Sequence, residues 1–151
     1  MAKSFDFRQA PGHLIRRAHQ VSWALFMEET AGFDMTPVQF AILSALLADP
    51  GEDQVTLARK VAFDPATFGS VIGRLEGRGW VRRAPDAADR RRKLLWVTPQ
   101  GVEVAQKMKG AVARVQRRIL EPLAPGEREQ LVALLDRLVA GHEGVAGSPA
   151  D

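Results

Sequence analysis

Two helix-forming segments that almost touch in the sequence constrain the fold more than any other feature. Thr56 is placed to cap a short helix through Val61, and Asp64-Pro65 supplies a cap and a first-turn proline for a second helix. The second segment carries apolar residues at the spacing i, i+3, i+4, i+7, namely Phe68, Val71, Ile72 and Leu75. Gly79 is a typical helix end. Two helices joined this closely predict a helix-turn-helix unit.

The chain before this unit predicts one more helix of the same domain. Thr36-Pro37, followed by Gln39, has the pattern of a capping box with proline at the first helical position. The helix should bury a stripe of Phe40, Leu43, Leu46 and Leu47. Gln54-Val55 fits a very short strand, and the helix after it should turn Leu57, Ala58, Val61 and Ala62 inward.

The chain after the unit predicts a hairpin and two long helices. Residues 80–83 and 94–97 read as paired strands, and the polar loop between them is too long for a tight turn. Thr98-Pro99 then caps a long helix to about Leu120. The expected fold class is mainly α with a small β-hairpin wing: a winged helix-turn-helix flanked by N- and C-terminal helices. The expected parts are an arm (1–10), a single unit (11–140, with end helices 11–32 and 99–140 around a winged unit 36–98) and a disordered tail (141–151).

The end helices carry apolar stripes that a single winged domain of this size cannot cover. The stripes comprise Leu14, Ala18, Val21 and Leu25 near the N-terminus, and Leu131, Leu134, Leu135 and Leu138 near the C-terminus. Burial across a two-fold axis would satisfy both stripes. The sequence therefore predicts a homodimer.

The positive charge is concentrated in the middle of the chain. Residues 74–93 hold eight basic and three acidic side chains, a balance of +5 in a chain whose net charge is +3. Such a cluster suits a polyanion, because arginine and lysine side chains displace condensed counterions from phosphates. A solvated surface loop is the other interpretation, and charge alone does not decide between them.

The outward face of the second helix favours nucleic acid. Its side chains are small or hydroxylic with one long cation, as the set Ala66, Thr67, Gly69, Ser70, Gly73 and Arg74 shows. Thr67 and Ser70 can meet bases or phosphates, and Arg74 can reach guanine or a phosphate. An ordinary surface helix would carry more Glu, Lys and Gln, and glycines there cost helix stability. Joined to the cationic hairpin, this face predicts binding to double-stranded DNA.

At this point the chain resembles the MarR family of bacterial transcription regulators. The matching stretches are Val55-Thr56-Leu57-Ala58, Asp64-Pro65-Ala66-Thr67, residues 74–83, Asp86, Asp89-Arg90-Arg91 and Val97-Thr98-Pro99-Gln100-Gly101. The resemblance implies a homodimeric winged helix-turn-helix whose DNA binding is relieved by small ligands, often aromatic acids. It departs from the family pattern at Ala88, usually basic, and at Gly69-Ser70, often Thr-Arg, which bears on base readout rather than on DNA binding.

The resemblance also assigns roles within the wing. Arg91 aligns with the arginine that enters the minor groove, where a narrow groove concentrates negative potential. Asp89 would repel phosphate, so its expected role is to orient a neighbouring arginine. Arg90, Arg92 and Lys93 are expected to supply general attraction to phosphate.

The first helix presents a candidate ligand site. Arg16, His19 and Trp23 lie at i, i+3 and i+7, and His13 stands one turn before Arg16. A cation, an imidazole and a large aromatic suit an aromatic carboxylate. The stretch 11–17 looks like MarR members that sense such acids. Trp23 as dimer core and Arg16 as a surface ion pair are the other readings, and Gln39 either lines the pocket or only caps its helix.

Other function classes find little support in the sequence. There is no cysteine, which excludes disulfides and thiol chemistry, and no nucleophile-elbow, Walker A or dinucleotide motif. His13 and His19 do not share a helix face, so no metal, cofactor or catalytic group is expected. The absence of an apolar span and of cysteine fits a cytoplasmic protein. The sequence favours a DNA-binding repressor released from a palindromic operator by a small aromatic acid; the alternative is a protein-interaction module without DNA.

Overall fold

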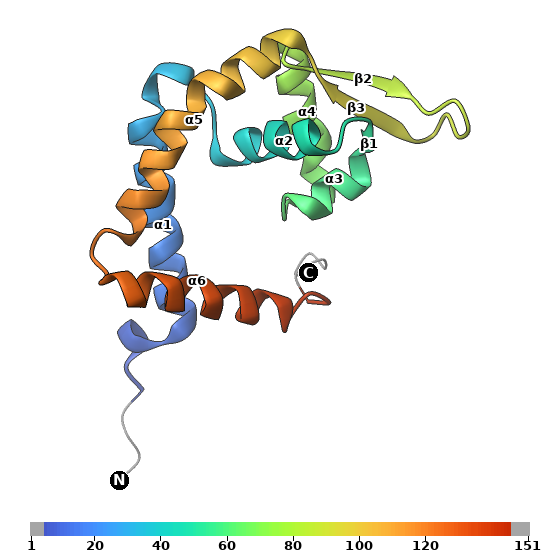
Figure 1. Ribbon diagram of the computed structural model, residues 1–151. Helices are drawn as coiled ribbons and strands as arrows, with labels where there is room; N and C mark the ends of the chain where they lie inside the picture. The colour runs from blue at the N-terminus through green and yellow to red at the C-terminus, as the bar shows by residue number, and fades with distance from the viewer. Residues whose placement is uncertain (1–4, 146–151) are drawn as a thin grey trace.

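Helices dominate the structure, a computed structural model that describes residues 5–145. The helices are α1 (Pro11–Glu29), α2 (Pro37–Ala48), α3 (Gln54–Lys60), α4 (Pro65–Gly77), α5 (Pro99–Leu120) and α6 (Pro125–Ala140), with short 3₁₀ turns at Phe7–Gln9 and Ala31–Phe33. The strands are β1 (Glu52–Asp53), β2 (Val81–Pro85) and β3 (Lys93–Val97). The expected class, mainly α with a small hairpin wing, is confirmed. Figure 1 shows α1 beside α5, and β2 and β3 projecting away from the helices.

Side-chain caps start the helices where the sequence predicts them. Thr36 Oγ1 accepts from the Gln39 backbone N–H at 3.3 Å, and Gln39 Oε1 accepts from the Thr36 backbone N–H at 3.0 Å, so the capping box is present. Asp64 Oδ1 accepts from Ala66 N–H at 3.1 Å. Thr98 Oγ1 accepts from Gly101 N–H at 3.1 Å. Each cap satisfies a backbone donor that the first helical turn leaves without a partner.

The region just before the helix-turn-helix unit differs from the prediction. The expected strand at Gln54-Val55 is wrong, because these residues already belong to α3 and the strand β1 precedes them. The cap of α3 is Asp53 rather than Thr56. Its carboxylate accepts from the Thr56 backbone N–H at 3.1 Å and from Thr56 Oγ1 at 2.6 Å. A carboxylate that receives both donors starts the helix three residues earlier than the hydroxyl would.

The three strands form an antiparallel sheet in the order β1-β3-β2. The register pairs Val81 with Val97 and Pro85 with Lys93. Trp80 lies outside its expected strand because its N–H bonds to Leu75 O at 3.0 Å and closes the end of α4. Gly79 permits this bend, since its φ of +74° lies in the left-handed region.

The core lies between α2, α3, α4, α5 and the sheet. The four inward residues of α4 are buried as predicted, and so are Leu43 and Leu46 of α2. Leu47, in contrast, is 39% exposed, and Ile42 takes its place in the core. The reason is that α2 packs against α5 and β3 as well as α3, which moves its buried face by part of a turn. Ala62 is also exposed, with φ of +54°, because it forms the bend between α3 and α4.

The outer helices bury much less. Helix α1 packs along α5 and ends at Glu29, before the end of the expected helix 11–32, and the next turn is 3₁₀. Residues of the predicted stripes are exposed in the single chain: Leu14, Val21, Leu134, Leu135 and Leu138. Within residues 5–145 no helix combines the length and apolarity needed to cross a membrane. Of the expected arm (1–10) and tail (141–151), positions 1–4 and 146–151 lie outside the described residues, whereas Phe7–Gln9 form a 3₁₀ turn and residues 141–145 form turns.

Candidate nucleic-acid interface and ligand site

The exposed face of α4 carries the three side chains predicted to meet DNA. Thr67 Oγ1 donates to Asp64 Oδ2 at 3.1 Å, and Ser70 Oγ donates to Thr67 O at 2.8 Å. Arg74 is exposed on the same helix. A Cβ added at Gly73 would meet nothing within 4 Å, so the surface there is low and open. Gly69 is less open than expected: a Cβ there would lie 3.4 Å from Gln54 Nε2 of α3.

The loop of the wing is closed by its own backbone. Asp86 N–H donates to Arg92 O at 3.0 Å, and Arg92 N–H donates to Asp89 O at 2.9 Å. Asp89 Oδ1 accepts from Arg91 backbone N–H at 3.1 Å and from Arg91 Nε at 3.3 Å. The Arg91 side chain is 93% exposed. The loop thus holds this guanidinium outward without burying it.

The structure divides the cations of residues 74–93 into two groups. Arg83 pairs with Glu76 of α4 at 2.8 Å, and Arg92 pairs with Asp53 at 3.3 Å. Arg78 donates to Asp34 O and its guanidinium carbon lies 3.7 Å from the centre of the Trp80 ring. These three arginines hold parts of the chain together. The other basic side chains of residues 74–93 are more accessible to a ligand.

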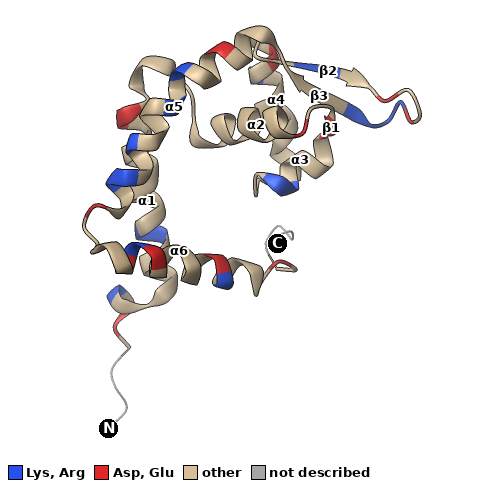
Figure 2. Ribbon diagram, in the orientation of Figure 1, with Lys and Arg blue, Asp and Glu red and all other residues tan. Residues whose placement is uncertain are grey.

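The outward group of cations lies on α4 and the wing. Arg82 stacks on Trp96, with 4.1 Å from guanidinium carbon to ring centre. Arg74, Arg90 and Lys93 are exposed and form no ion pair within the part of the chain that the structure describes. Figure 2 shows this charge along the wing, with the acidic residues of the loop between. A count of charges in the sequence could not separate the two groups, because the partners of Arg78 and Arg92 are far away in the chain.

The predicted ligand residues of α1 lie on an open surface of the single chain. His13 Nδ1 and Arg16 Nη2 are 3.2 Å apart, and the ring of Phe7 meets His13 edge-on with centroids 5.3 Å apart. His19 and Trp23 form a second pair, with ring centroids 6.5 Å apart. Trp23 remains 42% exposed. The structure therefore groups these side chains as neighbouring pairs but does not enclose them within one chain.

Gln39 lies apart from these residues on α2. It is buried, and its Oε1 is used by the capping box. The role in the helix cap is therefore present, and a role in a ligand site stays a prediction.

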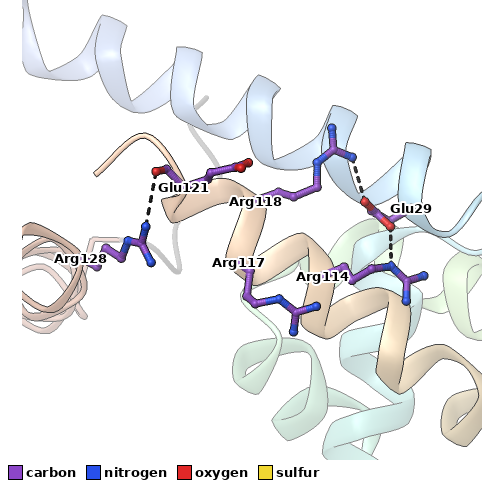
Figure 3. A pocket seen from close by; sticks show the side chains of 6 residues that line it. All are labelled: Glu29, Arg114, Arg117, Arg118, Glu121 and Arg128. Carbon is purple, nitrogen blue, oxygen red and sulfur yellow. Dashed lines mark hydrogen bonds and ion pairs between the residues drawn. The ribbon is translucent and has the colours of Figure 1, made fainter. Parts of the chain in front are cut away.

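A cleft that the sequence analysis missed lies where α5 bends into α6. It has a volume of about 360 Å³ and is lined by Glu29, Arg114, Arg117, Arg118, Glu121 and Arg128 (Figure 3). Glu29 accepts from Arg114 Nε at 2.8 Å and from Arg118 Nη1 at 2.9 Å. These bonds, Arg114 first, hold the pKa of the Glu29 carboxyl below its ordinary value. Three of the six charged side chains that line the cleft, Glu29, Arg114 and Arg118, thus join α1 to α5.

Arg128 explains the bend next to the cleft. Its Nε donates to the carbonyl of Leu123 at 2.8 Å, which ties the start of α6 to the turn before it. Arg114 and Arg118 are four residues apart and therefore lie on one face of α5. This spacing is the feature of the sequence that could have indicated the cluster. Their partner on α1 could not be identified from the sequence.

A short helix, a close second helix with a low hydroxylic face and a sheet with a cationic loop define the winged-helix class. The model of the MarR family matches residues 33–92, which span the end of the α1–α2 turn through the wing loop. Together with the relatives described next, this match shows that the chain belongs to the MarR family. The resemblance noted in the sequence is confirmed.

Curated relatives and solved structures agree with the family. The transcriptional regulator HosA of Escherichia coli O157:H7 is 32% identical over 127 residues, covering 84% of this chain and 93% of HosA. The transcriptional repressor NicR of Pseudomonas putida is 29% identical over 139 residues, covering 92% and 88%. The structure of Bordetella bronchiseptica BpsR has a TM-score of 0.85 at 32% identity, covering 89% of this chain and 96% of BpsR. HosA and NicR are transcription regulators.

Proposed function

We propose that this chain is a DNA-binding transcriptional repressor that acts as a homodimer and leaves a palindromic operator when a small aromatic acid binds. One observation carries the proposal. Arg74 on α4 and Arg90, Arg91 and Lys93 on the wing are exposed, and among the described residues only Arg91 forms an ion pair, with Asp89. If all these side chains formed ion pairs within the chain, the surface would carry no excess positive charge to bind phosphate.

The DNA contacts follow from the two elements that carry these side chains. Helix α4 is expected to enter the major groove, where Thr67, Ser70 and Arg74 meet bases or phosphates. The wing is expected to reach the adjacent minor groove with Arg91, while Arg90 contacts phosphate. Asp89 acts indirectly, since its carboxylate receives both the backbone and the side chain of Arg91.

The dimer is supported by the exposed apolar stripes of α1 and α6. A two-fold axis beside these helices would present two α4 helices to one face of DNA. Half-sites about one helical turn apart, roughly 34 Å, would then be read as an inverted repeat. We expect residues 11–140 to work as one unit, with 36–98 on the DNA and 11–32 and 99–140 at the two-fold axis.

The effector site is proposed on α1, with Arg16 pairing with the carboxylate and His13 or His19 donating a second hydrogen bond. Trp23 would pack on the ring, and Gln39 would line the side toward α2. The similarity to BpsR supports this class of ligand, because the BpsR structure concerns the regulation of its DNA binding by 6-hydroxynicotinic acid. Release requires that the ligand prefer the arrangement that does not fit DNA.

A salt-dependent titration of DNA from the promoter region of the chain's own gene tests the proposal. Each lost phosphate contact lowers the slope of log affinity against log salt by roughly 0.9. We expect Arg91→Ala and Arg74→Ala to weaken binding, Arg91→Ala most at A·T-rich flanks, and Arg8→Ala, an exposed arginine outside residues 11–140, to serve as the unaffected control. If both wing and helix variants bound DNA like the wild type, the assigned faces would be wrong. An absence of DNA binding at low salt would favour the alternative, a protein-interaction module.

A further inference from the structure

Arg92 is placed differently from the other cations at the wing tip. Its Nη2 lies 3.3 Å from Asp53 Oδ2, and its Nη1 lies 3.5 Å from Asp86 Oδ2. Asp86 begins the wing loop, whereas Asp53 belongs to β1 and precedes Arg92 by 39 residues in the chain. Arg92 therefore points back toward the body of the domain while Arg91 points outward.

The carboxylate that receives Arg92 already has a structural task. Asp53 caps α3, the first helix of the helix-turn-helix unit, through both donors of Thr56. The side chains of Asp53 and Asp86 are only 15% and 18% exposed. Two shielded carboxylates beside the wing are costly without a cation, so Arg92 stabilises both. An ion pair to a helix cap links the wing to a fixed point of the DNA-reading unit.

The wing loop itself is closed by bonds between Asp86, Asp89 and Arg92. A loop that is closed internally tends to move as one piece about its strands. The Arg92–Asp53 contact is a side-chain tie between that piece and α3. The contact would therefore affect DNA binding through the orientation of the wing, because it fixes where Arg91 points relative to α4.

We propose that Arg92 is a positioning residue for DNA binding, which holds the wing to α3 through Asp53 and does not itself contact phosphate. This rests on the proposed function as a DNA-binding regulator. For Arg92 it proposes a different role from the one expected from the sequence, which was general attraction to phosphate like that of Arg90 and Lys93.

Three variants separate positioning from charge. Arg92→Gln removes the tie, Arg90→Gln removes an outward cation of the same loop, and Asp53→Asn removes the partner's charge while keeping a good helix cap. Hydrogen exchange of the Asp86 and Arg92 amides, measured without DNA, reports the wing directly. We expect exchange about twofold to fivefold faster in Arg92→Gln and Asp53→Asn, the range for a partly exposed ion pair, and unchanged in Arg90→Gln.

DNA titrations of the same variants complete the test. Arg90→Gln should lower the salt slope by roughly 0.9, while Arg92→Gln should weaken binding with the slope retained. Asp53→Asn is decisive, because loss of an acidic charge near DNA should tighten binding by electrostatics alone, whereas loss of the tie should weaken it. Tighter binding by Asp53→Asn, or unchanged amide exchange in Arg92→Gln, overturns the proposal. If the wild type bound no DNA, the proposed function would fail while the exchange experiment still tested the tie.

Discussion

Similar apolar stripes are buried in the winged half of the molecule, residues 31–98, but exposed on the end helices α1 and α6. Ile42, Leu75 and Leu95 of the winged half are fully buried within the one chain. Helix α6 has no buried residue, and Leu134, Leu135 and Leu138 remain about half exposed. The same helical spacing of apolar residues thus corresponds to a core within the chain in the winged half, and to a surface without an apolar partner in the single chain on the end helices.

Charge shows the reverse contrast. At the junction of α1 and α5, Arg114 and Arg118 are joined to Glu29. On α4 and the wing, Arg74 and Arg90 have no such carboxylate among the described residues. The exposed stripes of α1 and α6 therefore lack apolar partners, while Arg74 and Arg90 lack anionic ones within the described residues. A second copy of the chain would supply the first, and DNA would supply the second.

The largest effect is expected from a charge placed on the open stripe. Leu134→Asp would put a carboxylate at the centre of the proposed dimer interface, where its desolvation costs several kcal/mol. We expect the sedimentation mass to fall from a dimer to one 16.6 kDa chain at micromolar concentration. DNA affinity should fall with it, because two half-sites are no longer bound together.

Leu47→Asp is the matched control, because Leu47 is an exposed leucine of the winged half. This variant should keep the dimer mass. Equal behaviour of the two variants would erase the distinction between the regions, and a monomeric wild type would remove it altogether.

The next largest effect concerns Gly101, where α5 passes against the winged half. A Cβ at this position would lie 2.2 Å from the Trp80 carbonyl oxygen and 2.6 Å from Val97 Cγ1. Backbone atoms cannot yield as a flexible side chain can, so Gly101→Ala should cost about 3 kcal/mol or more. Urea unfolding measures the loss.

Gly110, on the same helix, offers the opposite case. A Cβ there would meet only Arg114 Nη1, at 3.8 Å. Gly110→Ala should therefore stabilise the protein by about 0.5–1 kcal/mol, the usual gain in a helix interior. A similar change in stability for both variants would show that the close approach at Gly101 does not exist in solution.

The parts that could be predicted from the sequence are those set by local chemistry. Capping residues followed by proline fixed the starts of α2, α4 and α5 correctly, because both groups act within four residues. The errors fall where distant segments compete. Asp53 displaced Thr56 as the cap, beside a strand that exists only through pairing with β3.

For a similar reason Ile42 is buried where Leu47 was predicted to be, since the side of α2 that faces α5 is set by tertiary packing. The candidate site shows the same limit. Its side chains were identified as types in the sequence, but whether an arginine is outward or paired depends on residues such as Asp34 and Asp53 that fold against it. The predicted site residues themselves remain predictions.

A third prediction concerns the boundary between the two regions, where the effector is proposed. Arg16→Ala leaves the carboxylate of a bound aromatic acid without its cation, and loss of a charge-assisted hydrogen bond costs roughly 1.5–3 kcal/mol. Ligand affinity should fall about tenfold to hundredfold in a calorimetric titration of 6-hydroxynicotinic acid or another acid that binds the wild type. DNA binding without ligand should stay the same, since Arg16 belongs to α1, and Figure 2 shows α1 apart from β2 and β3 of the wing.

Arg17→Ala is the control for that titration, because Arg17 is exposed on α1 and, within residues 5–145, its side chain bonds only to Gln20. Its ligand affinity should equal that of the wild type. Equal affinity in the Arg16 and wild-type proteins would refute the pocket, and a parallel loss of DNA binding would make Arg16 a structural residue.

The smallest effect tests whether the paired charges of the α1–α5 junction contribute to stability. Hydrogen bonds from Arg114 and Arg118 lower the pKa of Glu29 below its ordinary value of 4.5. A carboxyl group whose pKa is lowered by folding stabilises the native state above its unfolded pKa, and loses that contribution as pH falls through the folded value. Glu29→Gln should therefore melt at a lower temperature than the wild type at pH 7, and the difference should shrink below pH 4.5.

Glu103 provides the comparison that isolates the junction. Its pKa is also lowered, by Lys107, but that pair lies within α5 and both side chains are well exposed. Because it joins no second helix and is screened by solvent, Glu103→Gln should change the melting temperature less than Glu29→Gln at every pH. Melting curves of the three proteins between pH 3 and pH 7 measure both differences. If Glu103→Gln had the larger effect, pairing at the junction would not be what holds α1 against α5, and apolar contacts such as that of buried Phe26 would have to do so alone.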